Sequence, residues 1–271
     1  MKKLIFAKPG ALLFILYFTV FHGSPAAYSI APAAPPSREI YEIKIYHLKN
    51  KSQEVRVDKF LQQAYIPAVH RTGVKNVGVF KPVGNDTVAD RRIYVFIPFS
   101  SLNQFASLPD QLAKDKDYNT AGADYLDAVY NDPPYIRLEV IQLEAFPDAP
   151  KMQLPQLKAP KAERIYELRS YESPTERYHI SKVKMFNEGG EIKLFKSLGF
   201  NGVFYSRVLA GCRMPNLMYM TTFENKAVRD EHWKAFFADP VWLKLSAMAE
   251  YKNNVSRNDT QFLVPVDYSD F

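Results

Sequence analysis

One strand-like stretch occurs twice in this chain, and the repeat limits what the chain can fold into. Residues 39–46 read EIYEIKIY and residues 164–171 read RIYELRSY, so the Ile-Tyr-Glu triplet returns 125 residues later. A repeat that drifts by only one residue over such a length indicates duplication. We therefore predict two copies of one unit. Further pairs at offsets of 125 or 126 are Phe60 with Phe186, Ile66 with Ile192, Gly73 with Gly199, Val77 with Val203 and Tyr94 with Tyr219.

The second copy predicts the order strand, helix, two strands, helix, strand. Residues 163–172 alternate as a strand, and Ser173-Pro174-Thr175-Glu176 supplies an N-cap, a helical proline and a capping-box glutamate for a helix that runs to Leu198. Residues 200–210 and 216–223 predict a hairpin, Asn225 caps a helix, and Asp239-Pro240 restarts a short one before a strand at 261–268. The first copy predicts the same order, with strands at 39–48, 74–83, 91–99 and 135–146, a helix at 52–71, and helices after Ser100.

This order is the split βαβ arrangement of ferredoxin-like domains. A four-stranded sheet with helices on one face must cover its other face, and two copies can cover each other. We predict an α+β fold in which tandem ferredoxin-like (βαββαβ) domains, residues 39–147 and 163–271, pair into a dimeric-α/β-barrel-like unit. A proline-rich linker at 148–162 joins them, because Pro147 to Ala162 contains four prolines.

The N-terminus has the layout of a secretory signal peptide. Lysines precede an apolar run from Ala11 to Phe21 that is shorter than the roughly 20 residues of a membrane-spanning helix, and small residues follow. We expect a signal peptide at 1–26, cleavage after Ala26 or Ala33, a disordered segment at 27–38, and a periplasmic or extracellular protein. An uncleaved membrane anchor is the alternative.

Charge and cysteine content exclude several partners. Removal of residues 1–26 lowers the formal charge from +6 to +3, and no basic run interleaved with aromatics suggests nucleic acid. We expect no nucleic acid, and no membrane once the signal is removed, while a homo-oligomer stays open. With one cysteine there can be no internal disulfide, but 47% hydrophobic residues allow a core.

The second copy carries motifs that resemble a known family. Tyr166 to Tyr171, Gly202 to Tyr205 and above all Glu231 to Trp242, EHWKAFFADPVW, are similar to a NIPSNAP domain of the dimeric α+β barrel superfamily, over about residues 164–268. The first copy keeps residues 41–46 but has no His-Trp pair in residues 105–112. The resemblance implies that any pocket lies in the second copy. The superfamily includes cofactor-free monooxygenases, haem-handling enzymes and proteins with no demonstrated chemistry.

Candidate site residues gather in the second copy, around His232. Aromatic residues at helical spacing usually form core, but here they can instead line an apolar cavity with His232 as its proton-transfer group. His232 is our choice of catalytic residue if a reaction occurs. The predicted ligand-binding residues are Arg169, Tyr171, Tyr205, Trp233, Phe236 and Trp242.

Charged residues alternate on one face of both repeated strands. Glu42 and Lys44 recur as Glu167 and Arg169, and we interpret them as structural ion pairs between the two halves. The alternative is a pocket in which Arg169 binds an anion and Glu167 acts as an acid or base.

Other candidates are weaker. Glu176 and His179 form a single E-x-x-H without the further carboxylates of a di-iron site. Cys212 beside Arg213 is interpreted as a bystander thiol, and His47 and His70 as solvated. No metal, phosphate-loop, dinucleotide or serine-nucleophile motif occurs, so no cofactor is predicted.

Three functional hypotheses remain open at this level. The leading one is an exported protein that binds a small organic or amphipathic ligand in the aromatic pocket. The second is a cofactor-independent monooxygenase in which His232 takes a proton while Tyr205 and Arg169 hold an oxyanion. The third is a structural interaction module whose pocket is merely core, and a cavity beside Trp233 and Trp242 discriminates against it. Whether the protein is an enzyme stays open.

Overall fold

Eight antiparallel strands close into one barrel in the computed structural model, which describes residues 37–271. Around the ring the order is β1-β3-β2-β8-β5-β7-β6-β4, and each neighbouring pair is antiparallel. Closure leaves no unpaired sheet edge. The strands are β1 (Ile40–Leu48), β2 (Gly78–Pro82), β3 (Arg91–Phe99), β4 (Arg137–Ala145), β5 (Ile165–Glu172), β6 (Asn201–Ala210), β7 (Asn216–Phe223) and β8 (Arg257–Pro265).

Each half of the chain contributes four consecutive positions of the ring. Around the ring in one direction, the order is β4-β1-β3-β2 in the first half and β8-β5-β7-β6 in the second half. The pairs β2–β8 and β4–β6 join the halves. The prediction of a mixed α+β fold with an antiparallel sheet is therefore confirmed.

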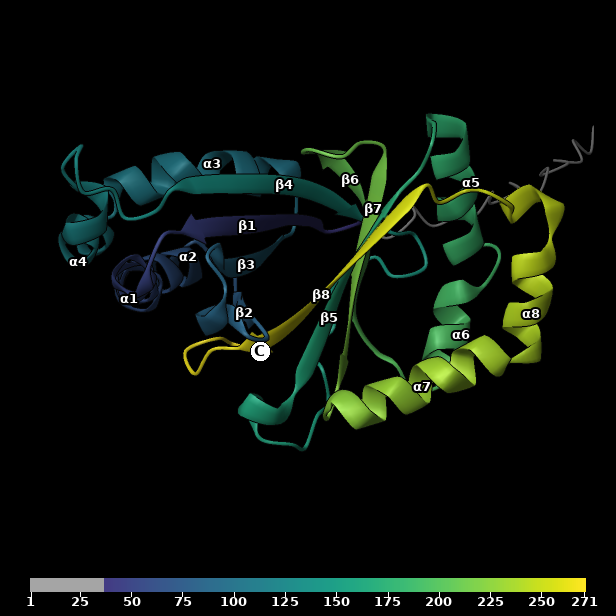
Figure 1. The fold of residues 1–271 in the computed structure, drawn as a ribbon. Helices are drawn as coiled ribbons and strands as arrows, with labels where there is room; N and C mark the ends of the chain where they lie inside the picture. The colour runs from purple at the N-terminus through teal and green to yellow at the C-terminus, as the bar shows by residue number, and fades with distance from the viewer. Residues whose placement is uncertain (1–36) are drawn as a thin grey trace, which may run out of the picture. The chain divides into compact units, whose positions relative to one another are not determined.

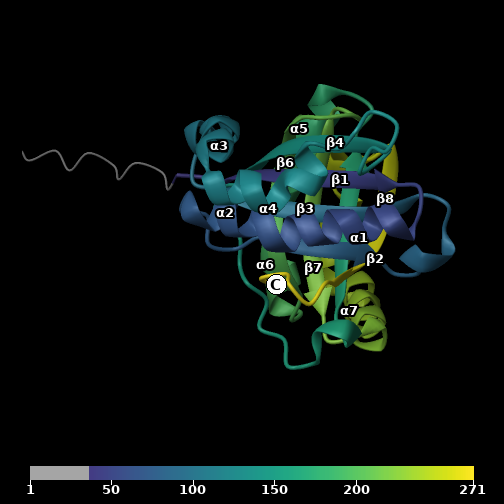
Figure 2. The ribbon, with the colours of Figure 1, turned by 90° about the vertical axis from the view of Figure 1, so that its left-hand side faces the viewer.

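Helices cover the barrel in two groups, α1 to α4 beside the first-half strands and α5 to α8 beside the second-half strands (Figure 1; Figure 2 shows the first group in front of the sheet). The helices are α1 (Lys51–Phe60), α2 (Ile66–Arg71), α3 (Leu102–Lys114), α4 (Lys116–Leu126), α5 (Glu176–Phe186), α6 (Glu191–Ser197), α7 (Lys226–Ala238) and α8 (Pro240–Ala247). A π-helical turn, Leu61–Tyr65, joins α1 to α2, so the predicted helix at 52–71 is continuous.

The two faces of each strand bury different apolar clusters, because successive side chains point to opposite sides. On β1, Tyr41, Ile43 and Ile45 belong to a cluster to which all eight strands contribute, which is the barrel interior. Tyr46 and Leu48 lie on the other face and pack beneath the first group of helices.

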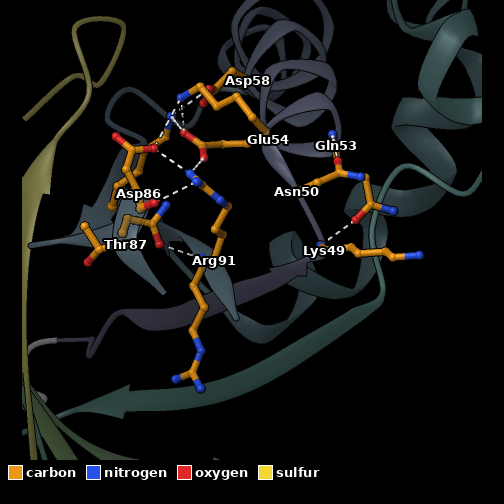
Figure 3. Close-up of polar contacts among 12 residues, drawn as sticks. Lys49, Asn50, Gln53, Glu54, Asp58, Asp86, Thr87 and Arg91 are labelled. Carbon is orange, nitrogen blue, oxygen red and sulfur yellow. Dashed lines mark hydrogen bonds and ion pairs between the residues drawn. The ribbon is translucent and has the colours of Figure 1, made fainter. Parts of the chain in front are cut away.

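A network of ionic contacts fixes α1 to the sheet of the first half (Figure 3). The buried Glu54 carboxylate accepts hydrogen bonds from Lys51 (2.9 Å), Lys81 (2.7 Å) and Arg91 (3.1 Å). Burial opposes the ionisation of Glu54, but these three donors outweigh it and lower its pKa. Tyr268, after β8, donates to Asp58 at 2.6 Å and so ties the end of the second half to α1.

Several local predictions were wrong. The helix after β5 begins at Glu176 with Thr175 as N-cap and no side-chain cap bond, while Ser173 donates to the Asn254 carbonyl instead. That helix is also broken, because α5 and α6 are separate around Gly189 and Gly190. A Cβ on Gly189 would lie 2.5 Å from the Met185 carbonyl oxygen, so only glycine permits the close turn.

Two of the repeat pairs are not equivalent in space. Val77 packs on the helix side, whereas Val203 lies in the barrel interior. Tyr94 pairs with Ile45 and lies in the barrel interior, whereas Tyr219 pairs with Arg169 and packs on the helix side. A shift of one residue in a strand reverses the face of every side chain, and that shift separates these two tyrosines.

The predicted signal peptide, and the segment at 27–38 except for its last two residues, lie outside the described residues. The predicted domain limits at 39–147, 148–162 and 163–271 stay predictions. No helix in the described part of the chain is long and apolar enough to span a membrane.

Candidate functional site

A cavity of about 230 Å³ lies between β5 and the helices of the second half. We call it the helix-covered cavity. Six of its thirteen lining residues are aromatic and five are polar, and they come from β5, α5 to α8, the segment between α8 and β8, and the start of β8. The lining residues are Tyr171, Lys182, Met185, Glu191, Trp233, Phe236, Phe237, Trp242, Ser246, Tyr251, Asn254, Val255 and Asn258.

Helices α7 and α8 place three of the aromatic residues. Asn225 caps α7 by accepting a hydrogen bond from the Val228 amide, as predicted, and Trp233 and Phe236 form its buried face. Asp239 caps α8 in the same way, with Pro240 in the first turn. The short connection brings the Trp242 ring to 4.5 Å from the Phe236 ring centroid, so the two helices share one aromatic wall.

The Glu167 carboxylate docks α7 onto the sheet. Glu167 is fully buried on the helix side of β5 and accepts hydrogen bonds from Arg229 Nε (2.7 Å) and Nη2 (2.6 Å). Trp233 Nε1 donates to the same carboxylate at 2.8 Å, and Arg169 Nη1 donates at 3.1 Å. Four donors satisfy this carboxylate, which offsets the cost of burying it.

Arg169 lies behind the cavity wall and does not line it. Its guanidinium carbon lies 4.3 Å from the Trp233 ring centroid and 5.5 Å from that of Tyr171. The Tyr171 and Tyr219 hydroxyls are 2.8 Å apart. Burial raises the pKa of Tyr171 to about 12, against the opposing effect of the positive charge on Arg169. The Tyr171 hydroxyl is therefore a neutral hydrogen-bonding group at ordinary pH.

A buried ion pair forms a further wall of the cavity. Lys182 Nζ on α5 lies 2.9 Å from Glu191 Oε2 at the start of α6, and the two residues are only 4% and 2% exposed. The Lys182 ammonium also lies 4.7 Å from the Phe186 ring centroid and 5.5 Å from that of Tyr171. A charged pair beside an aromatic cavity is the kind of polar feature that orients a small ligand.

The structure brings some predicted site residues together and separates others. Tyr171, Trp233, Phe236 and Trp242 line the helix-covered cavity, but Tyr205 and His232 do not. Tyr205 stacks on Tyr219 with ring centroids 5.7 Å apart and lines a different depression beside residues 148–156.

His232 points away from the cavity. Its Nδ1 donates to the Val228 carbonyl at 2.8 Å, and its ring packs near Phe200 and Phe223 with centroids 5.7 and 5.6 Å away. His232 and Trp233 are adjacent in a helix, so they face directions about 100° apart. The geometry gives His232 no access to a ligand in the cavity.

The predicted ion pairs lie within each half and not between the halves. Lys44 Nζ is 3.0 Å from Glu42 on the same strand, just as Arg169 is paired with Glu167. In the first half, Tyr46 of β1 packs in one cluster with Phe60 and Tyr125, whose ring centroids are 3.7 Å apart.

The interpretation of His47 as solvated was wrong. His47 is only 6% exposed and lies at one end of the barrel interior. His70 is partly exposed and lies 2.8 Å from Asp270. Within residues 37–271 no cluster of three or more histidine, cysteine or acidic residues is arranged to hold a metal.

Sequence reasoning missed Arg229, Lys182 and Glu191. A detectable signal exists for Arg229, because it precedes Trp233 by four residues and therefore shares its helix face. Lys182 and Glu191 meet only because the chain turns at Gly189, and no spacing rule predicts that contact.

By its structure, the protein is an antiparallel α+β barrel with a cavity between one face of the sheet and the helices that cover it. Residues 166–270 match the NIPSNAP family model, so the resemblance predicted from the Tyr166 and Glu231 motifs is confirmed for the second half. None of the curated proteins matches the sequence.

Solved structures similar to the whole barrel share its fold. A monooxygenase candidate from Lactobacillus acidophilus is 11% identical, with a TM-score of 0.54 over 84% of this chain and 94% of its own. A monooxygenase candidate from Fusobacterium nucleatum is 8% identical, with a TM-score of 0.54 over 84% and 93%. An anthrone oxidase-like protein is 8% identical, with a TM-score of 0.50 over 85% and 92%. At these identities the likeness concerns the fold alone.

Proposed function

We propose that this protein binds a small aromatic ligand bearing a hydroxyl group in the helix-covered cavity. The observation that carries the proposal is the combination of an aromatic wall with one buried ion pair, Lys182 and Glu191. An aromatic ring fits the wall, and a hydroxyl can both donate to Glu191 and accept from Lys182.

The size of the cavity limits the ligand. An apolar cavity of about 150 Å³ holds benzene, whereas drug-sized ligands need roughly 300–1,000 Å³. At about 230 Å³ the helix-covered cavity suits one substituted ring. The alternative of an interaction module with a merely packed core loses support, because Trp233 and Trp242 both border open space.

The test uses tryptophan emission, because the chain has two tryptophans and both line the cavity. We expect phenol or catechol to change the emission saturably. Ser246→Phe fills the cavity and should abolish the change. Ser107→Phe is the matched control, because Ser107 is also a half-buried helical serine whose hydroxyl donates to the carbonyl three residues earlier. Identical titrations of the two variants, or no response in the unsubstituted protein, would contradict the proposal.

A second candidate function is cofactor-independent oxygenation of the bound phenol. Glu191 favours it, because it is the carboxylate in the cavity lining and can take the phenolic proton while Lys182 holds the phenolate. One oxygen atom of dioxygen would enter the substrate. The other oxygen atom would leave as water with the two hydrogens that the substrate loses, the phenolic one and one on the ring. Oxygen uptake that survives Glu191→Gln, or that is lost in His232→Ala, would contradict this assignment of the base.

We further infer that the two halves are tandem ferredoxin-like copies. Support comes from their matching strand orders and from Gly73 and Gly199, which both have positive φ at the end of the helical connection between the first two strands of their half. Residues 163–271 alone would expose β6 and β8 as edges, so this fragment should self-associate. A stable monomer, by light scattering, would argue against paired copies.

Export is also proposed, on the basis of the lysines and apolar run within residues 1–26. N-terminal sequencing of protein secreted by a bacterial host tests it. We expect the mature chain to begin after Ala26 or Ala33, and an intact N-terminus in the cytosolic fraction would contradict export.

A further inference from the structure

A second cavity, of about 360 Å³, opens at one end of the barrel interior. We call it the barrel mouth. Strands of both halves line it, together with the turn between β6 and β7, and it shares no residue with the helix-covered cavity. Its charged residues are Arg92, Arg137, Glu139, Arg213, Arg257 and Asp259, and His47 lies beside them.

Strand alternation explains why this end of the interior is polar. On β5, the inward positions Tyr166 and Leu168 are followed two residues later by Ser170, which is hydrogen-bonded to Asn216 on β7 (2.8 Å). On β1, the inward Ile45 is followed by His47. The interior therefore changes from apolar to polar along its axis. The apolar residues that reach the mouth are Ile45, Tyr94, Ile141, Leu168 and Met218.

Positive charge predominates in the lining. Four arginines face two carboxylates there, and arginine does not lose its proton in proteins. Arg213 is paired with Asp259, and Arg92 is paired with Asp90 at 2.5 Å.

The other two arginines are held less tightly. Arg257 lies 3.4 Å from Asp259, which Arg213 already engages, and 3.9 Å from Glu172. Arg137 lies 3.2 Å from Glu139, and the Arg137 and Arg257 side chains are 65% and 61% exposed. Both can turn toward a ligand.

The ring order sets Arg137 and Arg257 on opposite sides of the mouth. Arg137 belongs to β4 and Arg257 to β8, and these strands lie four positions apart in a ring of eight. A ligand between the two would contact both halves of the chain.

His47 adds a buried polar atom to this site. Its Nδ1 lies 2.9 Å from Asp90 Oδ1. Its Nε2 is 3.1 Å from Glu139 Oε1 but makes no hydrogen bond of adequate geometry within the described residues. A buried ring nitrogen without a well-aligned hydrogen bond is uncommon, and one beside a cavity can serve a bound group.

We propose that the barrel mouth binds a small organic carboxylate. The carboxylate lies between Arg137 and Arg257, and its apolar part points inward to Ile45, Leu168 and Met218. Guanidinium groups bind carboxylates through paired, charge-assisted hydrogen bonds, which accounts for this choice of ligand. The site is independent of the function proposed for the helix-covered cavity.

The test uses the single cysteine as a local reporter, because Cys212 is exposed and lines the barrel mouth. The probe is benzoate, with benzamide as its neutral counterpart of similar shape. We expect benzoate to slow the alkylation of Cys212 by iodoacetamide saturably and benzamide to have little effect. Tryptophan emission should not change, because both tryptophans lie in the other cavity.

Variants then assign the binding to the two arginines. Arg257→Gln and Arg137→Gln should each weaken the protection by about tenfold, the typical effect of losing one charge-assisted contact. Arg177→Gln, at an exposed position of α5 outside the mouth, should leave the protection unchanged. Unaltered thermal unfolding of the variants checks that the barrel is intact.

Four results would overturn the proposal, the first three from the alkylation measurement itself. These three are an absence of protection by benzoate, equal protection by benzamide, and unchanged protection in the two mouth variants. A change of tryptophan emission that tracks the protection would place benzoate in the helix-covered cavity, which also overturns it.

Discussion

The side chains of Glu167 and Arg229 form a two-point ion pair that joins strand β5 to helix α7, with N–O distances of 2.7 and 2.6 Å. Glu167 is fully buried, so the pair decides where α7 lies on the sheet. The same carboxylate holds the Trp233 indole, and thus one contact network sets the aromatic wall of the cavity.

Arg229→Met should destabilise the fold by about 3–5 kcal/mol, because it leaves the buried Glu167 carboxylate without its principal partner. Urea unfolding measures the change in free energy. Lys226→Met is the matched control on the same helix, because Lys226 pairs with Asp230 on the surface and should contribute little. Equal effects of the two substitutions would show that Glu167 does not depend on Arg229.

Trp233→Phe should cost about 1–3 kcal/mol, because it removes the Nε1 donor to Glu167 while an aromatic ring stays in place. Trp242→Phe is the comparison, since Trp242 lines the same cavity but does not donate to Glu167. Thermal and urea unfolding of both variants would separate loss of the hydrogen bond from loss of ring area. A larger loss at Trp242 would contradict the role given to the Nε1 donor.

Much of the site could be predicted from the strand pattern, and the failures have physical causes. The period of two placed Glu167, Arg169 and Tyr171 on one face correctly. The strand period could not predict which face lines the barrel interior, because that depends on how the sheet closes. The same closure buries His47, which lies near the end of its strand and looked solvated.

Helix patterns had a similar limit. The motif around Trp233 pointed to the correct helix, but the choice between His232 and Trp233 as the inward residue depends on the rotation that Glu167 imposes. Lys182 and Glu191 lie on either side of a helix break, so helical periodicity could not pair them.

The stability of the protein should fall as pH rises from about 10 to about 12, in part through Tyr171. Burial raises the pKa of Tyr171 to about 12, whereas an unfolded tyrosine has a pKa of about 10. The folded state therefore holds this proton more tightly. The stabilisation that Tyr171 contributes to the folded state is therefore complete below pH about 10 and is lost as the pH approaches 12.

Tyr171→Phe should flatten this part of the stability profile by about 2–3 kcal/mol over the two pH units. Urea unfolding at a series of alkaline pH values measures the slope. Tyr130→Phe is the control, because Tyr130 is fully exposed and contacts no comparable environment. An unchanged slope in Tyr171→Phe would mean that this hydroxyl titrates as in the unfolded chain.

The ion pair of Lys182 and Glu191 predicts a strongly non-additive pair of substitutions. Lys182→Met alone should cost about 3–5 kcal/mol, because Glu191 is 2% exposed and would be left unpaired. Replacing both residues by methionine removes the uncompensated charge, so the double variant should be more stable than the single one. A double-mutant cycle from urea unfolding measures the coupling.

The same double variant separates stability from ligand binding. With the charges gone, the fold is retained but the cavity has lost the ion pair that we propose binds the ligand hydroxyl. Phenol should then bind no better than toluene, whereas the unsubstituted protein should prefer phenol, as measured by tryptophan emission. If the double variant keeps that preference, the hydroxyl must be recognised elsewhere in the cavity, for example by Tyr171 or Asn258.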